Sequence, residues 1–282
     1  MLKKQLIMES AIELFAKKGI DATSVQQITE HCGISKGAFY LSFKSKDELI
    51  FSIIDYFTKN VTANIERSVS EQQNPHDKLA AYFMEIFNIL QKYGDFATVF
   101  IKEQHFINET LIDKMAYYDE LNNKLLLDIL RELYPSNVDS LQYDLIIIIK
   151  GLIASYGDFI IKNSYPFDIE KLTDSLVEKI KIIAKYGEKS FFTKDMFKSY
   201  SSHQPMITKD LIVEELQQLL THIQDEVLRE SLQILEKQIQ SESPSKAIIL
   251  GMLSNLKNEQ ECDWFCYMMR KYYELNISNT PF

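Results

Sequence analysis

A short run of residues in the first part of the chain has side chains that could bind DNA. Lys36 could reach a guanine edge or a phosphate, and Gly37 and Ala38 are small enough to allow close approach to the bases. The Ala38 methyl group could also touch a thymine methyl group. Tyr40 and Lys46 are better suited to phosphate oxygens, which position a protein on DNA without reading sequence. These residue types predict a DNA-reading surface.

A second set of hydrogen-bond donors lies upstream of this run. Thr23 and Ser24 carry hydroxyl groups, and Ser24 is placed to begin a helix. The first turn of a helix has free backbone N–H groups and a positive dipole end, which together favour a phosphate. We therefore expect the start of this helix to contact the DNA backbone.

Short helices must position these donors. The first is expected over Lys3–Lys18, with Gly19 as its left-handed stop. Ser24 and Gln27 have the spacing of a capping box, which predicts the start of a second helix, and Gly33 ends it. Each signal occurs in many helical proteins, but their order along the chain favours a compact helical head over unrelated helices.

A third helix is expected over 36–43, capped by Ser35 and burying Phe39 and Phe43, and Ser45 then begins a fourth. The turn between the second and third helices, 33–35, is very short and contains Gly. Two short helices joined in this way are the helix-turn-helix pattern, whose second helix enters the major groove. A plain three-helix cluster without DNA binding is the alternative.

Residues 11–49 resemble the DNA-binding domain of the tetracycline-repressor (TetR) family. The residues that carry the resemblance are Ala11, Leu14, Phe15, Gly19, Thr23, Ile28, the run 33–37, Phe39, Tyr40, Phe43 and the run 45–49. The resemblance implies a cytoplasmic homodimer that binds a palindromic operator in double-stranded DNA, usually a repressor released by a small molecule. It places DNA contacts at Thr23, Ser24, Ser35, Lys36, Gly37, Ala38, Tyr40, Ser42 and Lys46. The chain departs from the family pattern at Cys32, where Ala is usual, and at Ser42, where His is frequent.

Composition favours an all-α fold. The chain of 282 residues is 46% hydrophobic but has only 8 Gly and 6 Pro, and apolar residues recur every three or four positions. We expect an N-terminal three-helix DNA-binding domain (1–48), a larger helical effector-binding and dimerisation domain (49–190) and an additional C-terminal helical segment (191–282). The net charge of −9 divides into +1 for residues 1–50 and −10 for the rest, so the acidity lies away from the expected reading head.

The chain shows no pattern typical of a secreted or membrane protein. Three cysteines are too few for a disulfide framework, which indicates a cytoplasmic protein. The first residues form a charged amphipathic pattern without the apolar run of a signal peptide. The most hydrophobic stretch, 141–161, is interrupted by Asp144, Lys150 and Asp158, so a buried helix is favoured over a membrane span.

Breaks in the apolar pattern divide the middle of the chain into helices. Pro75 begins one helix, a break is expected at 93–95, a bent pair covers 96–134, and two long helices follow over 138–163 and 168–187. In the TetR family the last two pack against their mates in the dimer. Apolar residues that could form such a face, or ordinary core, are Ile146, Ile149, Ile153, Ile160, Leu172, Leu176, Ile180 and Ile183.

An effector pocket is expected among the helices of 82–160, for a largely apolar small molecule. Aromatic and Met residues with a few polar groups suit such a pocket, although aromatic residues at helical spacing usually form core. The candidates are Tyr82, Phe96, Phe100, Glu103, His105, Phe106, Met115, Tyr118, Tyr156 and Asp158.

The C-terminal segment is expected to contain a Ser-rich link (199–205) and helices over 209–240, from 243 to about 258, and over 261–275. Each has one apolar stripe, which indicates that they pack together or on the body. A stabilising cap is one hypothesis; closure of the effector site or a larger dimer contact is the other.

Enzymatic and metal-dependent functions have no support in the sequence. No Gly-rich phosphate loop, activated nucleophile or ligand cluster is evident, and no cofactor is expected. His105 has no second ligand at metal-binding spacing, and Cys262 with Cys266 fits two buried thiols better than a redox switch. A transcriptional activator with the same head, or a helical adaptor that does not read DNA, remains as the alternative to a repressor.

Overall fold

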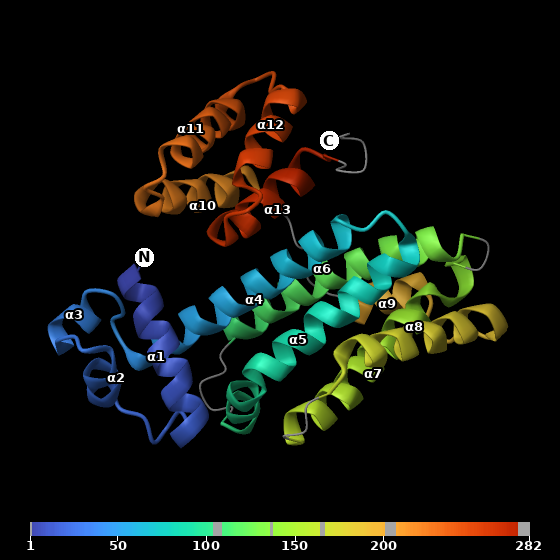
Figure 1. The fold of residues 1–282 in the computed structure, drawn as a ribbon. Coiled ribbons are helices and arrows are strands. Elements are labelled where there is room, and N and C mark those ends of the chain that lie inside the picture. Colours follow the sequence, from blue (N-terminus) through green and yellow to red (C-terminus); the bar gives the residue numbers. More distant parts are fainter. Residues whose placement is uncertain (1, 104–108, 136–137, 164–166, 201–206, 276–282) are drawn as a thin grey trace.

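The protein is described by a computed structural model over residues 2–103, 109–135, 138–163, 167–200 and 207–275 (Figure 1). All regular elements in these ranges are helical, which confirms the predicted all-α fold. The α-helices are α1 (Leu2–Lys18), α2 (Val25–Cys32), α3 (Lys36–Tyr40), α4 (Lys46–Ser70), α5 (Pro75–Lys102), α6 (Glu109–Leu133), α7 (Val138–Lys162), α8 (Ile169–Tyr186), α9 (Lys194–Tyr200), α10 (Lys209–His222), α11 (Glu226–Gln240), α12 (Lys246–Leu256) and α13 (Asp263–Tyr272).

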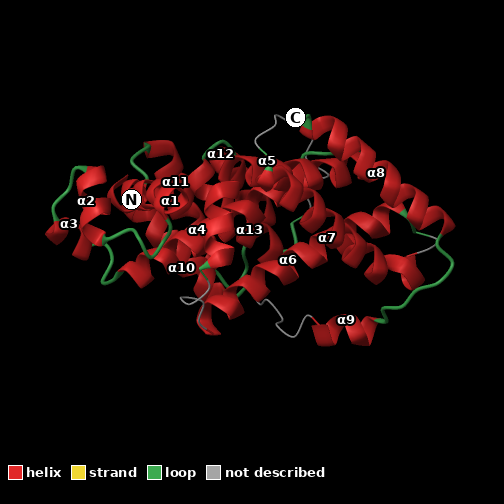
Figure 2. Cartoon of the chain, turned by 90° about the horizontal axis from the view of Figure 1, so that it is seen from below, coloured by secondary structure: helices red, strands yellow, loops and turns green. Residues whose placement is uncertain are grey.

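Helices α1 to α3, here called the head, form around their own core at one end of the molecule (Figure 2). Phe15 of α1, Ile28 of α2 and Phe39 of α3 are fully buried, and Leu49 and Ile53 from the start of α4 complete the core. Because α4 supplies part of this core, the head is fixed to the first turns of that helix. The predicted ends of α1 and α2 are confirmed, whereas α3 is shorter than predicted and ends at Tyr40.

Local signals account for both ends of α2. The Ser24 hydroxyl accepts a hydrogen bond from the Gln27 backbone N–H at 3.2 Å, and the Gln27 side chain accepts one from the Ser24 N–H at 2.8 Å. This is the predicted capping box. Gly33 ends α2 with φ 67°, a left-handed conformation that glycine adopts without steric cost.

Helices α4 to α8, here called the body, enclose a second core. Phe83 and Phe87 of α5 have nearly parallel rings and lie with Leu126 of α6, Ile146 of α7 and Ile180 of α8. The hydrophobic stretch 141–161 forms most of α7, which buries Leu145, Ile146 and Ile149 in the body core but leaves Phe159 exposed, so the prediction of a buried helix holds for one side of α7. None of the helices in the described ranges has the length and apolar character needed to cross a membrane.

The predicted break at 93–95 is wrong, because α5 runs without interruption through Gly94. A Cβ atom at Gly94 would lie 2.8 Å from Ile161 Cγ1, and one at Gly157 would lie 2.7 Å from Leu90 Cδ1. Gly94 and Gly157 therefore allow α5 and α7 to approach each other closely. The glycine at 94 reflects helix packing rather than a turn.

The segment after residue 190 also differs from the prediction. Phe197 of α9, a helix that the sequence did not indicate, lies 4.9 Å from the Tyr143 ring and joins the body core. The helix predicted over 209–240 is two helices: α10 ends before Ile223, and Asp225 caps α11 by accepting a hydrogen bond from the Leu228 N–H at 3.0 Å. Buried Ile223 lies at the turn between them.

Helices α10 to α13, here called the C-terminal bundle, have a third core. Leu216, Leu232 and Ile249 of the first three helices are fully buried with Phe265 of α13. Figure 1 shows the bundle seated on the side of α4 and α6, above the body. The predicted packing of these helices with one another and on the body is thus observed.

Two ion pairs join α13 of the bundle to α4. Arg67 Nη1 lies 2.7 Å from Asp263 Oδ2, and Arg270 Nη2 lies 2.7 Å from Glu66 Oε2. The side chains of Asp263, Glu66 and Arg270 are largely buried, and burial raises the pKa of Asp263 despite the neighbouring Arg67 guanidinium. The contact between α4 and α13 is therefore a packed interface that encloses charged groups.

Candidate DNA-binding site

Helix α3 presents opposite faces to the protein and to solvent. Phe39 and Phe43 anchor it in the head core. Lys36 and Gly37 are exposed on the other side, and Tyr40 is 54% exposed. The structure therefore brings three predicted DNA contacts, Lys36, Gly37 and Tyr40, together on the outer surface of the head.

The start of α3 is held by a cap and by a contact with α2. The exposed Ser35 accepts a hydrogen bond on Oγ from the Ala38 N–H at 3.2 Å, and Ala38 itself is half-buried. Lys36 Nζ donates to the Gln26 side-chain oxygen at 3.3 Å. A neutral amide is a weaker partner for an ammonium than a phosphate, so Lys36 can exchange this contact for one with DNA.

Thr23 and Lys46 have structural contacts that the sequence did not reveal. Thr23 is fully buried, and its hydroxyl donates to the Gly19 carbonyl at 2.7 Å. Lys46 Nζ donates to the carbonyls of Ile20 at 2.6 Å and Thr23 at 3.0 Å. An ammonium has three donors, so Lys46 keeps one for a phosphate, whereas the Thr23 side chain does not reach the surface. A contact from residue 23 to DNA would have to use its backbone.

The two predicted serine contacts differ in accessibility. Ser24 is exposed at the start of α2, where its hydroxyl already accepts the capping hydrogen bond. Ser42 is half-buried, and its hydroxyl donates to the Ala38 carbonyl at 3.4 Å. Ser24 thus offers the more open position for a phosphate oxygen.

Sequence reasoning missed Leu41, which is 88% exposed just beyond the end of α3. The signal for it was present, because Leu41 lies midway between Phe39 and Phe43, both of which are buried. A side chain between two core positions must point away from the core. Leu41 extends the apolar and aromatic part of the outer surface next to Tyr40.

The head is also joined to the C-terminal end of α5. Glu103 Oε2 accepts a hydrogen bond from the Asp21 backbone N–H at 2.9 Å. A Cβ atom at Gly19 would lie only 2.6 Å from the other carboxylate oxygen, Glu103 Oε1. Gly19 also has a positive φ of 90°. Glu103, a predicted polar anchor of the effector pocket, therefore contacts the loop between α1 and α2.

The aromatic residues predicted for the effector pocket belong to different cores. Tyr82 lies in the body core, and Phe96 and Phe100 pack with the head core. Tyr118 lies in the core of the C-terminal bundle, and its hydroxyl donates to Asp55 Oδ1 at 3.2 Å. The structure does not bring these side chains together around one cavity.

The remaining effector candidates are no closer together. Met115 and Asp158 are exposed, and Asp158 pairs with Lys162 of the same helix at 2.8 Å. Tyr156 packs at the edge of the body core. His105 and Phe106 lie outside the described residues. A contact between any of the predicted pocket residues and an effector therefore stays a prediction.

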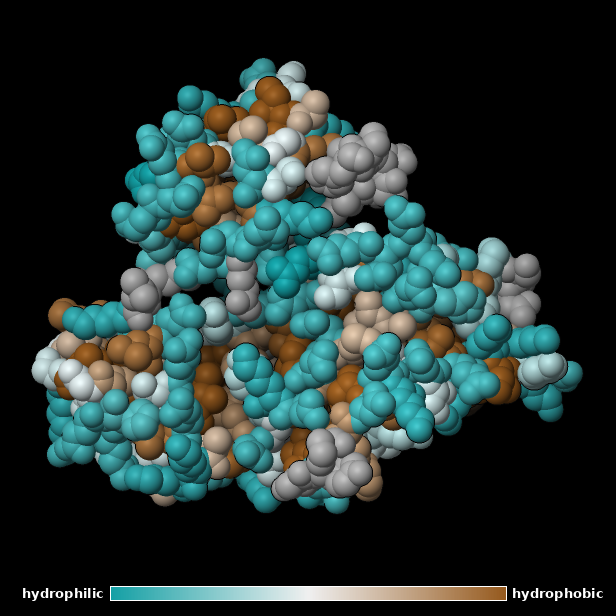
Figure 3. Space-filling view, in the orientation of Figure 1, coloured by the Kyte–Doolittle hydropathy of each residue, from teal (hydrophilic) through white to brown (hydrophobic). Residues whose placement is uncertain are grey.

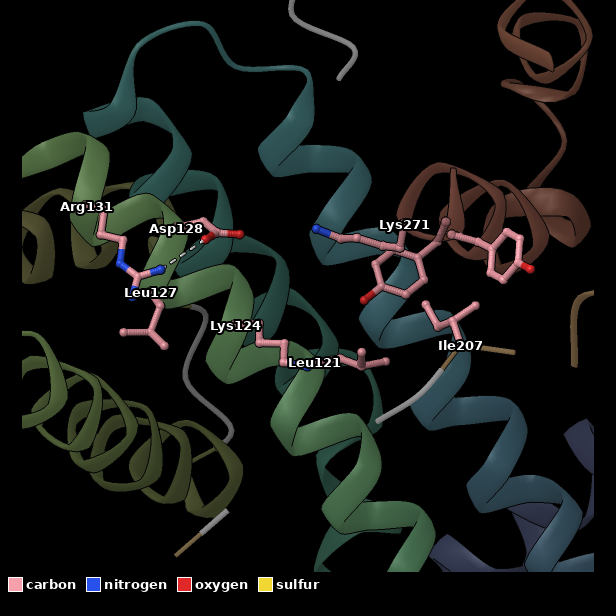
Figure 4. Close-up of a pocket in the computed structure, with 9 residues that line it drawn as sticks. Leu121, Lys124, Leu127, Asp128, Arg131, Ile207 and Lys271 are labelled. Atoms are coloured by element: carbon pink, nitrogen blue, oxygen red, sulfur yellow. Dashed lines mark ion pairs between the residues drawn. The ribbon is translucent and has the colours of Figure 1, made fainter. Parts of the chain in front are cut away.

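None of the predicted effector residues lines either of the following two cavities on the described part of the surface. One, of about 500 Å³, lies between α6 and α13 (Figure 4). The other, of about 210 Å³, lies between α4 and α5 and includes Tyr56, Asn60 and Lys92.

The described residues contain no group of three or more His, Cys, Asp or Glu side chains that could hold a metal ion. Cys262 and Cys266 are both buried, as the hypothesis of two buried thiols requires. Burial raises the pKa of the Cys266 thiol to about 12 and also raises that of Cys262. Both groups are therefore protonated and unreactive in the folded protein at neutral pH.

Comparison with known proteins shows the family. Residues 7–53 match the family model described as "Bacterial regulatory proteins, tetR family". The HTH-type transcriptional regulator YerO of Bacillus subtilis (strain 168) is 30% identical over 270 residues, which cover 93% of this chain and 92% of YerO. The chain belongs to the tetR family of bacterial regulatory proteins. It is a DNA-binding transcriptional regulator, so the predicted function class is confirmed.

Other relatives match different shares of this TetR-family regulator. YuxN of Bacillus subtilis is 27% identical over 270 residues and covers 92% of the chain. The structure of FadR from Bacillus subtilis in complex with stearoyl-CoA has a TM-score of 0.53 and 23% identity, and covers 62% of this chain and 96% of FadR. The structure of a putative transcriptional regulator from Pseudomonas aeruginosa PAO1 has a TM-score of 0.57 and 19% identity, and covers 65% of this chain and 90% of that regulator. Those solved structures share the fold but leave about a third of this chain unmatched, whereas YerO and YuxN match nearly all of it.

Proposed function

We propose that this TetR-family regulator is a homodimeric repressor that binds a palindromic operator and is released by a small, largely apolar effector. The observation that carries the proposal is the outer face of α3, where Lys36, Gly37 and Tyr40 are exposed while Phe39 holds the helix in the head core. A relative named as a repressor, KstR2 of Mycobacterium tuberculosis, is 26% identical over 129 residues, which supports repression. The stearoyl-CoA complex of FadR supports an apolar effector.

The same face suggests how the operator would be read. α3 would enter the major groove with Lys36 and Ala38 toward base edges, while Tyr40, Ser24 and Lys46 contact phosphates. Two heads related by a two-fold axis would bind half-sites about 34–36 Å apart. An effector that favours a body geometry with a different head spacing would lower operator affinity by shifting the conformational equilibrium.

The dimer surface would lie on the outer faces of α7 and α8. Ile146, Ile149, Leu176 and Ile180 are fully buried within one chain, so these four predicted face residues are core rather than partner contacts. Exposed apolar residues on the other side of the two helices are Phe159, Ile182 and Tyr186. Figure 2 shows α8 at the end of the molecule opposite the head, where a second copy has room to pack.

The proposal is tested by DNA binding of the full chain. Random double-stranded DNA is selected on the purified protein, and the selected sequence is assayed at several salt concentrations against excess competitor. We expect a near-palindrome to be enriched and bound in the presence of competitor. Lys36→Ala should weaken binding of the selected sequence and relax the base preference at the position that Lys36 contacts. Lys237→Ala, an exposed lysine on α11, is the matched control and should change neither.

Selection without enrichment of any sequence would contradict a sequence-specific regulator of this kind. Enrichment of a single half-site bound by one chain would contradict the homodimer while leaving the DNA-binding assignment in place. If Lys36→Ala binds the selected DNA as tightly as the parent protein, α3 does not read the operator in the proposed way.

A further inference from the structure

The groove between α6 and α13 exists only because the C-terminal bundle packs on the body. Leu121, Lys124, Leu127 and Arg131 come from one face of α6, and Tyr267 and Lys271 come from α13 (Figure 4). Its volume of about 500 Å³ is within the usual range for small-molecule sites. Helix α6 belongs to the body, so neither the body nor the bundle could form this groove alone.

The inner wall of the groove is apolar. Leu121 and Tyr267 are almost fully buried, and Leu127 and Ile207 are partly buried. Tyr272 stands at the edge and is 40% exposed. Such a wall favours an apolar chain or ring, because burial of apolar surface is the main source of binding free energy.

The rim of the groove is cationic. Lys124 and Lys271 are both exposed and form no ion pair with a described residue. Arg131 Nη1 lies 3.8 Å from Asp128 Oδ1 on the same helix, so this carboxylate offsets one of the three cations. The groove thus holds a net positive charge in a chain whose net charge is −9. Charge complementarity favours an anionic ligand.

We infer that this groove binds an amphipathic carboxylate, an apolar chain whose carboxylate lies between Lys124 of α6 and Lys271 of α13 while its tail lies along the partly exposed apolar side chains of Leu127, Ile207 and Tyr272. The two lysines come from different parts of the fold, so one bound anion would hold the C-terminal bundle against the body. The inference concerns a binding site and does not depend on the proposed repression.

The chain contains a natural reporter for the site. Trp264 is its one tryptophan, and its ring lies 5.1 Å from the Tyr267 ring and nearly parallel to it. Lys271 Nζ lies 5.9 Å from the centre of the Tyr267 ring, so an anion bound at Lys271 changes the surroundings of this pair. Tryptophan emission of the unmodified protein therefore reports occupation of the groove.

The test uses full-length protein and decanoate as the probe, at concentrations where it is monomeric. Calorimetry measures binding, and Trp264 emission reports its location. We expect saturable binding of decanoate with a change in emission, and much weaker binding of 1-decanol, which has the same tail without the charge, and of acetate, which has the charge without the tail. Lys124→Gln with Lys271→Gln should weaken decanoate binding at least tenfold.

The matched control is Lys237→Gln with Lys246→Gln, which removes the same charge from exposed positions on α11 and α12. It should bind decanoate as the parent protein does, and circular dichroism should show equal thermal stability of both double variants. Equal binding of decanoate and 1-decanol, an equal loss in both double variants, or binding with unchanged Trp264 emission would each overturn the inference, as would no binding at all. Acetate binding as tightly as decanoate would indicate an adventitious anion only.

Discussion

Glu103 and Asp21 are 82 positions apart in the sequence, and a hydrogen bond of 2.9 Å joins the Glu103 carboxylate to the Asp21 backbone N–H. The bond connects the end of α5 to the loop between α1 and α2. Lys46 holds the same loop through the carbonyls of Ile20 and Thr23. The loop that orients α2 is therefore held by α4 and by the end of α5, so a movement of α5 relative to α4 would act on the head directly.

Replacement of Glu103 should loosen this connection. Glu103→Ala removes the acceptor, and because the bond is solvent-exposed we expect a loss of only about 0.5 kcal/mol in the free energy of unfolding. Glu103→Gln keeps an acceptor oxygen, so its free energy of unfolding should fall by less than that of Glu103→Ala. Urea denaturation measures both variants. Equal stability of the parent protein and both variants would show that the bond contributes nothing to the fold.

A charge on the proposed dimer surface should separate the two chains. Phe159 and Ile182 are 55% and 52% exposed on α7 and α8. Phe159→Glu with Ile182→Glu places two buried, unpaired carboxylates in the proposed interface, and we expect monomer mass in sedimentation at micromolar concentration. Val227→Glu, at an equally exposed position on α11, is the control and should stay dimeric. A double variant that also stays dimeric would place the interface elsewhere.

Glycines at two helix positions should respond to alanine in opposite directions. A Cβ atom at Gly94 would meet Ile161 Cγ1 at 2.8 Å, so Gly94→Ala should lower the free energy of unfolding by about 1 kcal/mol through overpacking. At Gly251 of α12 no atom lies within 4 Å of such a Cβ. Gly251→Ala should therefore raise the free energy of unfolding by about 1 kcal/mol, because alanine has the higher helix propensity. Thermal denaturation of the two variants checks the difference in sign, and a stabilised Gly94→Ala would refute the close approach of α5 and α7.

The ion pair between Arg270 and Glu66 should be costly to break on one side only. Both side chains are largely buried, so Arg270→Ala leaves a carboxylate without its partner and should cost about 3 kcal/mol. Glu66→Gln with Arg270→Met removes both charges and should recover part of this loss. Chemical denaturation of the three proteins provides the comparison. A double variant less stable than Arg270→Ala would mean that the attraction within the pair contributes more to the free energy of unfolding than the uncompensated charge costs.

The cysteines should differ in reactivity. Cys32 is half-buried, whereas Cys262 and Cys266 are buried, so a thiol reagent at pH 8 should modify Cys32 first and the other two only on unfolding. Burial raises the pKa of Cys266 to about 12 from 9.0 in the unfolded chain. The unfolded state then loses a proton that the folded state keeps, so the free energy of unfolding falls as pH rises from about 9 to 12. Urea denaturation at pH 8 and 10 should show a smaller decrease for Cys262→Ala with Cys266→Ala.

The head could be predicted from the sequence because its signals are local. Ser24 with Gln27 defines the start of α2, and the left-handed Gly33 defines its end, each within a few residues. The body was harder, because a glycine such as Gly94 looks the same whether it ends a helix or admits a neighbouring one. The position of Ile161, which decides between the two, is set 67 positions later in the chain.

The candidate effector residues show the same limit at the level of cores. Spacing indicates that Tyr82, Phe96 and Tyr118 are each on the apolar side of a helix, but not which core each enters, and the three lie in three different cores. The groove at Lys124 and Lys271 was equally hidden, since its two sides are brought together only by packing of the C-terminal bundle on α6. Figure 3 shows that the face in view is mostly hydrophilic with scattered apolar patches.

The pairs that join α4 to α13 also bear on the order in which the protein is made. Arg67 and Asp263 are 196 positions apart, and Glu66 and Arg270 are 204 apart. The head can fold from nearby contacts soon after it leaves the ribosome, whereas one side of α4 stays uncovered until residue 270 has been synthesised. Contacts of such long range form slowly and leave apolar surface exposed in the meantime. During synthesis, the side of α4 that carries Ala63 and Glu66 is therefore where a nascent chain most needs protection from aggregation.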